Sequence, residues 1–97
     1  MITAPAQAPV ELDAAGSVFT QKALQLRTGP GTVYVVNADA GPHTFEIELN
    51  GRVLSYPVPA RSTAAVVLDL PAAGRFTYWC AIPGHRSTME GTLEVIE

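Results

Sequence analysis

Three side chains that can bind a soft metal fall within ten residues near the end of the chain. The segment "YWCAIPGHRSTMEG", residues 78–91, contains Cys80, His85 and Met89. Cys80 is the only cysteine, and the other histidine, His43, stands in "AGPHTFEI". Four residues separate Cys80 from His85, and three separate His85 from Met89. A thiolate, two imidazoles and a thioether therefore form a candidate set of ligands.

Each of these residues alone has an ordinary structural explanation. A single buried cysteine is usually a small apolar side chain, and a methionine often fills gaps in a core. A histidine beside a turn is usually solvated. The combination is more specific, because one cysteine, two histidines and a weakly bound methionine form the ligand set of blue-copper electron-transfer sites. Cu(I) favours soft sulfur and Cu(II) favours imidazole, so this set suits both oxidation states.

The residues leave four other interpretations open. Cys80 with His85 as a base would be a hydrolytic thiol, but His43 and Met89 would then have no role. Structural zinc uses four Cys or His ligands and makes little use of methionine, so zinc fits less well. A similar ligand set could carry and deliver copper instead of electrons. The last alternative is an adhesive β-sandwich with no metal in its pocket.

The composition limits the class of protein. The chain has 97 residues, 47% hydrophobic and 15% charged, which is enough for one globular domain. Six basic and nine acidic residues give a net charge of −3. Nucleic acid is therefore not an expected partner, because phosphate binding needs clustered Lys and Arg. No apolar run approaches the roughly 20 residues that cross a bilayer, so the sequence predicts no membrane span.

Alternation of apolar and polar residues is the dominant pattern along the chain. It is clearest in "TFEIELN", where Phe45, Ile47 and Leu49 alternate with glutamates. Comparable runs are "PVELDA", "ALQLRT", "TVYVVNA", "RVLSY", "AAVVLDL", "RFTYWC" and "TLEVIE". Such runs are typical of half-buried β-strands, and Asn50-Gly51 between two of them predicts a tight hairpin. Gly29-Pro30-Gly31 predicts another turn. About seven or eight short strands in one domain predict an all-β sandwich or small barrel.

The first residues differ from the rest in composition. "MITAPAQAP" is rich in alanine and proline, so we expect residues 1–9 to form a flexible segment and residues 10–97 to form one domain. The segment has neither the basic region nor the apolar region of an export signal. A spacer of this kind can follow a removed signal or a membrane tether upstream.

These motifs resemble those of cupredoxins, the small blue-copper proteins that include plastocyanin, amicyanin and azurin. The resemblance rests on "NADAGPHTFEI" and "GRFTYWCAIPGHRSTMEGTLEV" and extends from about "SVFTQ" to the end. The Cys-x4-His-x3-Met spacing is similar to that of azurin, and the short length to that of plastocyanin and amicyanin. The resemblance implies a Greek-key β-sandwich with one copper ion. It also implies that Cys80, His43 and His85 are the strong ligands and that Met89 is the long axial ligand.

The resemblance further implies how the protein works. It predicts a monomeric one-electron carrier, not an enzyme, in the periplasm or another extracytoplasmic compartment. Redox partner proteins would dock transiently near His85, where the surrounding sequence is small or apolar and Arg86 is the only nearby charge. Many family members have Asn after the first ligand histidine to link the ligand loops, and this chain has Thr44 there. Trp79 is predicted on the outer face, either as a second docking area or simply half-covered by a neighbouring loop or the N-terminal segment.

Overall fold

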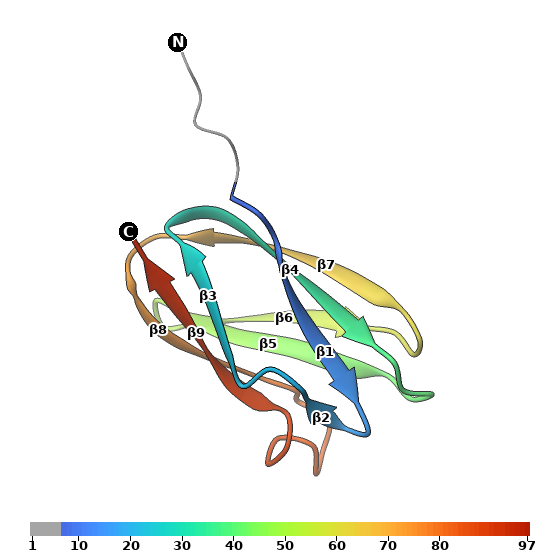
Figure 1. The fold of residues 1–97 in the computed structure, drawn as a ribbon. Coiled ribbons are helices and arrows are strands. Elements are labelled where there is room, and N and C mark those ends of the chain that lie inside the picture. Colours follow the sequence, from blue (N-terminus) through green and yellow to red (C-terminus); the bar gives the residue numbers. More distant parts are fainter. Residues whose placement is uncertain (1–6) are drawn as a thin grey trace.

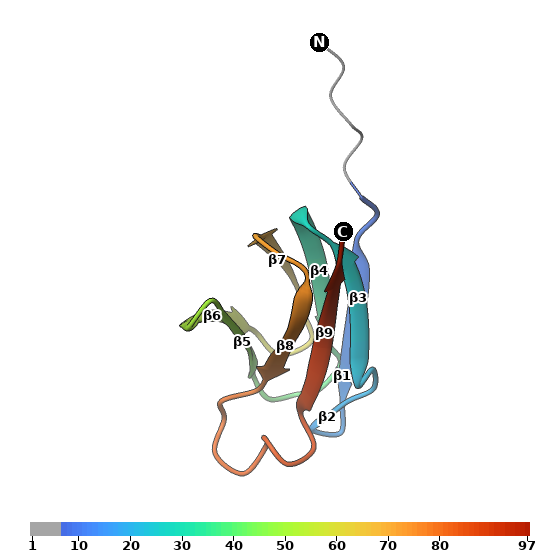
Figure 2. The same cartoon turned by 90° about the vertical axis from the view of Figure 1, so that its left-hand side faces the viewer.

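Two β-sheets pack face to face in the computed structural model, which describes residues 7–97 (Figures 1 and 2). The sheets have the strand orders β2-β1-β4-β7 and β3-β9-β8-β5-β6. The strands in this range are β1 (Val10–Ala15), β2 (Val18–Phe19), β3 (Ala23–Arg27), β4 (Gly29–Asn37), β5 (His43–Leu49), β6 (Arg52–Val58), β7 (Thr63–Leu70), β8 (Gly74–Trp79) and β9 (Glu90–Ile96). The predicted all-β sandwich is confirmed. Within residues 7–97 no helix is long and apolar enough to cross a membrane.

Pairing between strands brings distant parts of the chain together. β1 runs parallel to β4 and β3 runs parallel to β9, whereas the other neighbouring strands are antiparallel. β5 and β6 form the hairpin predicted at Asn50-Gly51. Both turn residues have positive φ, 51° and 76°, as a type I′ hairpin turn requires.

The core lies between the sheets and is built from alternate residues of each strand. In β5, Phe45, Ile47 and Leu49 are all buried. In β8, Tyr78 is fully buried and its hydroxyl donates to the carbonyl of Gln21 at 2.8 Å. Burial raises the pKa of Tyr78 to about 12, so this hydroxyl keeps its proton at neutral pH. Side chains two residues apart in a strand share a face, and the inward row of β8 therefore leads to Cys80.

Two details of the strands differ from the sequence prediction. β4 begins at Gly29, so Gly29-Pro30-Gly31 belongs to a strand and the turn predicted there was wrong. Pro30 is tolerated because β1 pairs with β4 only from Val33 onward, which leaves Pro30 with a neighbouring strand on one side. The described residues form nine strands instead of seven or eight, because β2 has only two residues and is too short to show a period.

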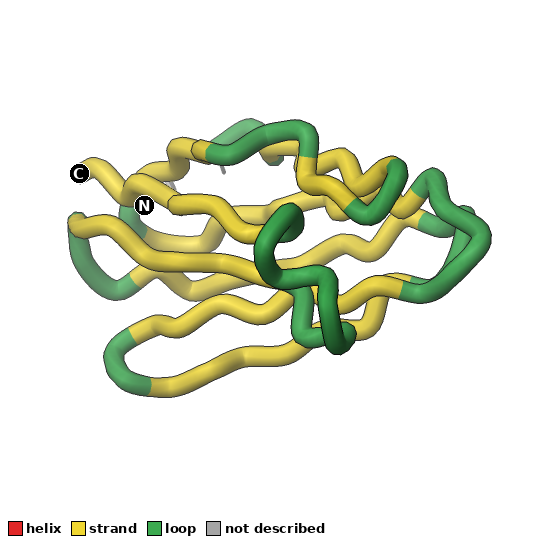
Figure 3. Tube along the Cα trace, turned by 90° about the horizontal axis from the view of Figure 1, so that it is seen from below, coloured by secondary structure: helices red, strands yellow, loops and turns green. Residues whose placement is uncertain are grey.

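Three connections meet at one end of the sandwich. They are the β1–β2 turn, the β4–β5 loop and the β8–β9 loop. Figure 2 shows the last of these extending beyond the strands, and Figure 3 views the molecule from that side. β1 begins and β9 ends at the opposite end (Figure 1). Residues 1–6 of the expected flexible segment lie outside the described residues, and Gln7 donates through its side chain to the carbonyls of Arg27 and Pro30.

Candidate metal centre

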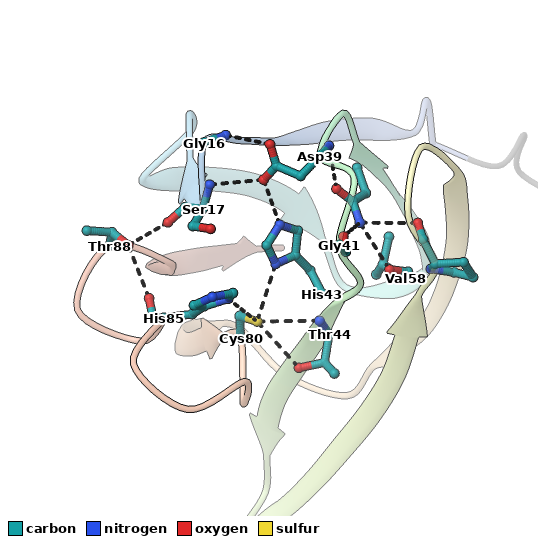
Figure 4. A network of polar contacts seen from close by, with 12 residues as sticks. Gly16, Ser17, Asp39, Gly41, His43, Thr44, Val58, Cys80, His85 and Thr88 are labelled. Carbon is teal, nitrogen blue, oxygen red and sulfur yellow. Dashed lines mark hydrogen bonds and ion pairs between the residues drawn. The ribbon is translucent and has the colours of Figure 1, made fainter.

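The side chains of His43, Cys80 and His85 converge where these loops meet (Figure 4). Their ligand atoms all lie within 4.8 Å of one another. Cys80 Sγ is 4.0 Å from His43 Nδ1 and 3.9 Å from His85 Nδ1. Metal–sulfur and metal–nitrogen bonds are about 2.3 and 2.0–2.1 Å long for zinc, so one ion fits between the three atoms. The donor set therefore suits a metal that accepts both sulfur and imidazole.

The cluster is largely closed to water. Cys80 is 0% exposed and His43 is 2% exposed, whereas His85 is half-buried. The rings of His43 and His85 lie 5.2 Å apart between their centroids and are tilted by 58°. Access to the cluster from solvent is therefore greatest beside His85.

His43 is positioned by the β4–β5 loop, whose shape depends on buried Asn37. The amide nitrogen of Asn37 donates to the carbonyls of Gly41 and Val58 at 3.0 and 3.2 Å. Its carbonyl oxygen accepts the N–H of Asp39 at 2.8 Å. Because Asn37 is 1% exposed and these bonds join the loop to β6, the entry of His43 into β5 is fixed.

Asp39 holds the outer nitrogen of His43. Asp39 Oδ2 lies 2.7 Å from His43 Nε2 and also accepts the N–H of Ser17 at 2.9 Å. Asp39 Oδ1 accepts the N–H of Gly16 at 2.7 Å. Hydrogen bonds from Ser17, His43 and Gly16, in that order of effect, lower the pKa of Asp39 to about 2. The only signal in the sequence was an acid four residues before His43, because its other partners lie 22 and 23 residues away.

Thr44 links the loop of His43 to the loop of Cys80. Its N–H donates to Cys80 Sγ at 3.4 Å, and its hydroxyl lies 3.8 Å from the same sulfur. The hydroxyl oxygen also accepts the N–H of Ala81 at 2.8 Å. Thr44 therefore connects the two loops in the place where many cupredoxins have asparagine.

The β8–β9 loop is folded by its own backbone hydrogen bonds. His85 N–H donates to the carbonyl of Ile82 at 3.0 Å across Pro83-Gly84. Pro83 followed by Gly84, whose φ is 83°, is the sequence typical of the two central positions of a type II turn. Met89 is fully buried, its N–H donates to the carbonyl of His85, and its carbonyl accepts the N–H of Cys80. The turn therefore orients His85. The backbone of Met89 is hydrogen-bonded to the backbones of both Cys80 and His85.

The geometry also resembles a hydrolytic triad, because Cys80, His43 and Asp39 follow one another in contact. Such a triad needs a nucleophile that a substrate can reach. Cys80 is fully buried, and a second imidazole, that of His85, points its Nδ1 at the same sulfur. Several donors directed at one enclosed point are what a metal ion requires. The geometry therefore favours a metal site over a nucleophile.

Trp79 is covered by a side chain of the β8–β9 loop, that of Arg86. The guanidinium carbon of Arg86 lies 4.5 Å from the centre of the Trp79 ring. Arg86 also pairs with Glu90, with Nε and Oε2 at 2.7 Å. The interpretation of Trp79 as an aromatic half-covered by a neighbouring loop is confirmed.

Besides Arg86, two charged side chains lie at the loops around the cluster: Asp39, which contacts His43, and Lys22. Lys22 Nζ donates to the carbonyl of Thr88 on the β8–β9 loop at 2.7 Å. The expectation that Arg86 is the only nearby charge was therefore wrong, because the fold brings Lys22 across 66 residues to the same loop.

Comparison with known proteins defines the fold. No family model and no curated protein matches the chain. Auracyanin from the photosynthetic bacterium Roseiflexus castenholzii matches in structure with a TM-score of 0.80 and 16% identity, over 96% of this chain and 100% of that one. Auracyanin A, a "blue" copper protein from Chloroflexus aurantiacus, gives 0.76 and 18%, over 91% and 98%. An oxidised mutant of amicyanin gives 0.72 and 24%, over 94% and 85%. The fold is that of these cupredoxins, as the sequence resemblance implied.

Proposed function

We propose that this protein is a one-electron carrier with one copper ion in a mononuclear type 1 site. The observation that carries the proposal is the convergence of Cys80 Sγ with Nδ1 of His43 and His85 at one end of a cupredoxin fold. In this proposal these three residues are the strong ligands and Met89 is the weak axial ligand. Copper, when bound, supplies the exchange between Cu(I) and Cu(II).

The residues of the chain keep such a site dry and rigid. Burial of Cys80, His43 and Met89 excludes water from most of the cluster. Asn37 and Thr44 tie the ligand loops to each other and to the strands, which limits rearrangement when the charge at the site changes. We propose no catalytic reaction, since a full set of four ligands leaves no position for a substrate.

Electrons would pass through the half-buried ring of His85. Small or apolar residues precede both histidines in the sequence: Gly41 and Pro42 before His43, and Ala81, Ile82, Pro83 and Gly84 before His85. All of these are exposed except Ile82, which is partly buried against the core. Such a surface suits brief contacts with redox partner proteins, which bury little area. We propose that the protein works as a monomer in the periplasm or another extracytoplasmic compartment.

Addition of equimolar Cu(II) to the metal-free protein tests the proposal. We expect an intense visible thiolate-to-copper band that disappears on one-electron reduction and returns on oxidation. Copper binding without this band would contradict a type 1 site. A blue site that loses its copper to a chelator within seconds would favour copper carriage and delivery over electron transfer.

A further inference from the structure

The turn between β1 and β2 lies between the two loops that carry the histidines (Figure 4). Gly16 and Ser17 both have positive φ, 63° and 57°. Successive N–H groups in such a turn form a concave site for an anion, and here both donate to the carboxylate of Asp39. Two backbone donors from one turn therefore fix the position of this carboxylate.

The same turn contacts the loop that carries His85. The hydroxyl of Thr88 donates to the carbonyl of Ser17 at 2.5 Å, and it lies 3.2 Å from the carbonyl of His85. The N–H of Phe19 donates to the carbonyl of Thr88 at 3.2 Å. The turn is therefore held from the side of His85 while it holds Asp39 on the side of His43.

The contact with Asp39 bears on which ring nitrogen of His43 carries the proton. A carboxylate accepts hydrogen bonds and donates none, so the proton of a neutral His43 ring must lie on Nε2, 2.7 Å from Asp39 Oδ2. The lone pair of the ring is then on Nδ1, the atom 4.0 Å from Cys80 Sγ. The ring is 2% exposed, so water cannot readily replace Asp39 in this role.

We propose that Asp39, held by the Gly16–Ser17 turn, is a positioning residue that sets the His43 tautomer and lowers the reduction potential of the bound copper. The clause on copper rests on the proposed function. A carboxylate that accepts the second N–H of a ligand histidine makes the other nitrogen a stronger donor. A stronger imidazole donor stabilises Cu(II) more than Cu(I), which lowers the potential.

The tautomer can be measured without copper and without a substitution. Nitrogen-15 NMR of the metal-free protein, at a pH where His43 is neutral, should place its ring proton on Nε2. A ring proton on Nδ1 of His43 would overturn the proposal. This measurement is independent of the colour of the copper protein, so it tests Asp39 even if the proposed function fails.

The potential is tested with Asp39→Asn, which keeps the shape of the side chain and removes its charge. Loss of such a partner typically weakens metal binding 10- to 100-fold. We expect about a tenfold loss of Cu(II) affinity relative to Cu(I), which corresponds to a rise of about 59 mV in potential.

Asp69→Asn is the matched control. Asp69 is exposed and pairs with Pro30, at the end of β7 remote from the cluster, so its removal changes the net charge alone. The Asp69→Asn potential should equal that of the wild type. Equal potentials for the Asp39→Asn and Asp69→Asn proteins would overturn the proposal. If the Asp39→Asn protein does not fold, the nitrogen-15 NMR measurement of the His43 tautomer in the wild-type protein tests the proposal instead.

Discussion

Thr44 contacts the sulfur of Cys80 through both its backbone and its hydroxyl, and the two effects can be separated. Thr44→Val keeps the N–H and the shape of the side chain but removes the hydroxyl. We expect a lower reduction potential, because a thiolate with fewer hydrogen-bond donors gives more electron density to Cu(II). The N–H of Ala81 also loses its acceptor, which should cost about 0.5–1.5 kcal/mol of unfolding free energy.

Thr44→Ser is the control for this prediction, because it retains the hydroxyl. Its potential should lie near that of the wild-type protein when both are measured by voltammetry. If the valine and serine variants have the same potential, the hydroxyl does not act on the sulfur.

The proposed ligands differ in strength, and substitution can rank them. Cys80→Ser removes the soft thiolate, so the blue band should vanish even where copper still binds. Met89→Leu should keep the band and raise the potential, because Cu(II) loses a weak axial donor. Absorption spectra and voltammetry of the two copper-loaded variants measure this. A colourless Met89→Leu protein, or a blue Cys80→Ser protein, contradicts the assignment.

The three clustered residues were predictable because their types are rare in this chain. Cys80 is unique and the two histidines can be read directly from the sequence. Asp39 was not predictable, since it is one of nine acidic residues and its role depends on a turn more than 20 residues away. A role that is set by contacts between distant segments leaves little trace in local spacing.

Strands were predictable from alternation where one face is buried, as in β5 and the inward row of β8. The period of two tells inside from outside, and it thereby placed Cys80 inward and Trp79 outward. β2 escaped detection because two residues have no period. The start of β4 was misread because glycine and proline usually mark turns, whereas here the strand is unpaired with β1 at that point.

β9 contains a glycine that the packing of β8 requires. Gly91 pairs with Tyr78, and a Cβ on Gly91 would overlap the Tyr78 ring and lie 2.7 Å from the Lys22 carbonyl. Overpacking of this kind costs about 1–3 kcal/mol, so Gly91→Ala should lower the unfolding free energy by that amount. Denaturant titration of the metal-free protein measures it.

Gly41→Ala is the matched control for Gly91→Ala. A Cβ on Gly41 meets no atom within 4 Å, so the change in stability should stay within about 0.5 kcal/mol. Equal stabilities for the two alanine variants would mean that β8 and β9 adjust to the added methyl group without cost.

At the scale of the whole molecule, the candidate metal centre lies far from the start of β1 and the end of β9. The cluster lies at the loops, whereas β1 begins and β9 ends at the other end of the sandwich (Figures 1 and 2). The end near His85 carries Lys22, Asp39 and the Arg86–Glu90 pair, which are charges of both signs. Because these charges are few, steering of a partner should be weak and the rate of electron transfer only mildly dependent on salt.

Pro42 provides the sharpest test of docking at this end. It is exposed and immediately precedes His43, so Pro42→Glu places a charge on the apolar surface without removing a ligand. Electron self-exchange between oxidised and reduced copies, measured by NMR line broadening, should slow several-fold, because each encounter must then desolvate two carboxylates. Ile82→Glu should act in the same direction.

The control is Val67→Glu on β7, where the side chain is 65% exposed and the change in net charge is the same. The copper spectrum should be unaltered in the Pro42 and Val67 variants. If both exchange electrons at the wild-type rate, the apolar surface beside His85 does not serve docking and only keeps the metal site dry.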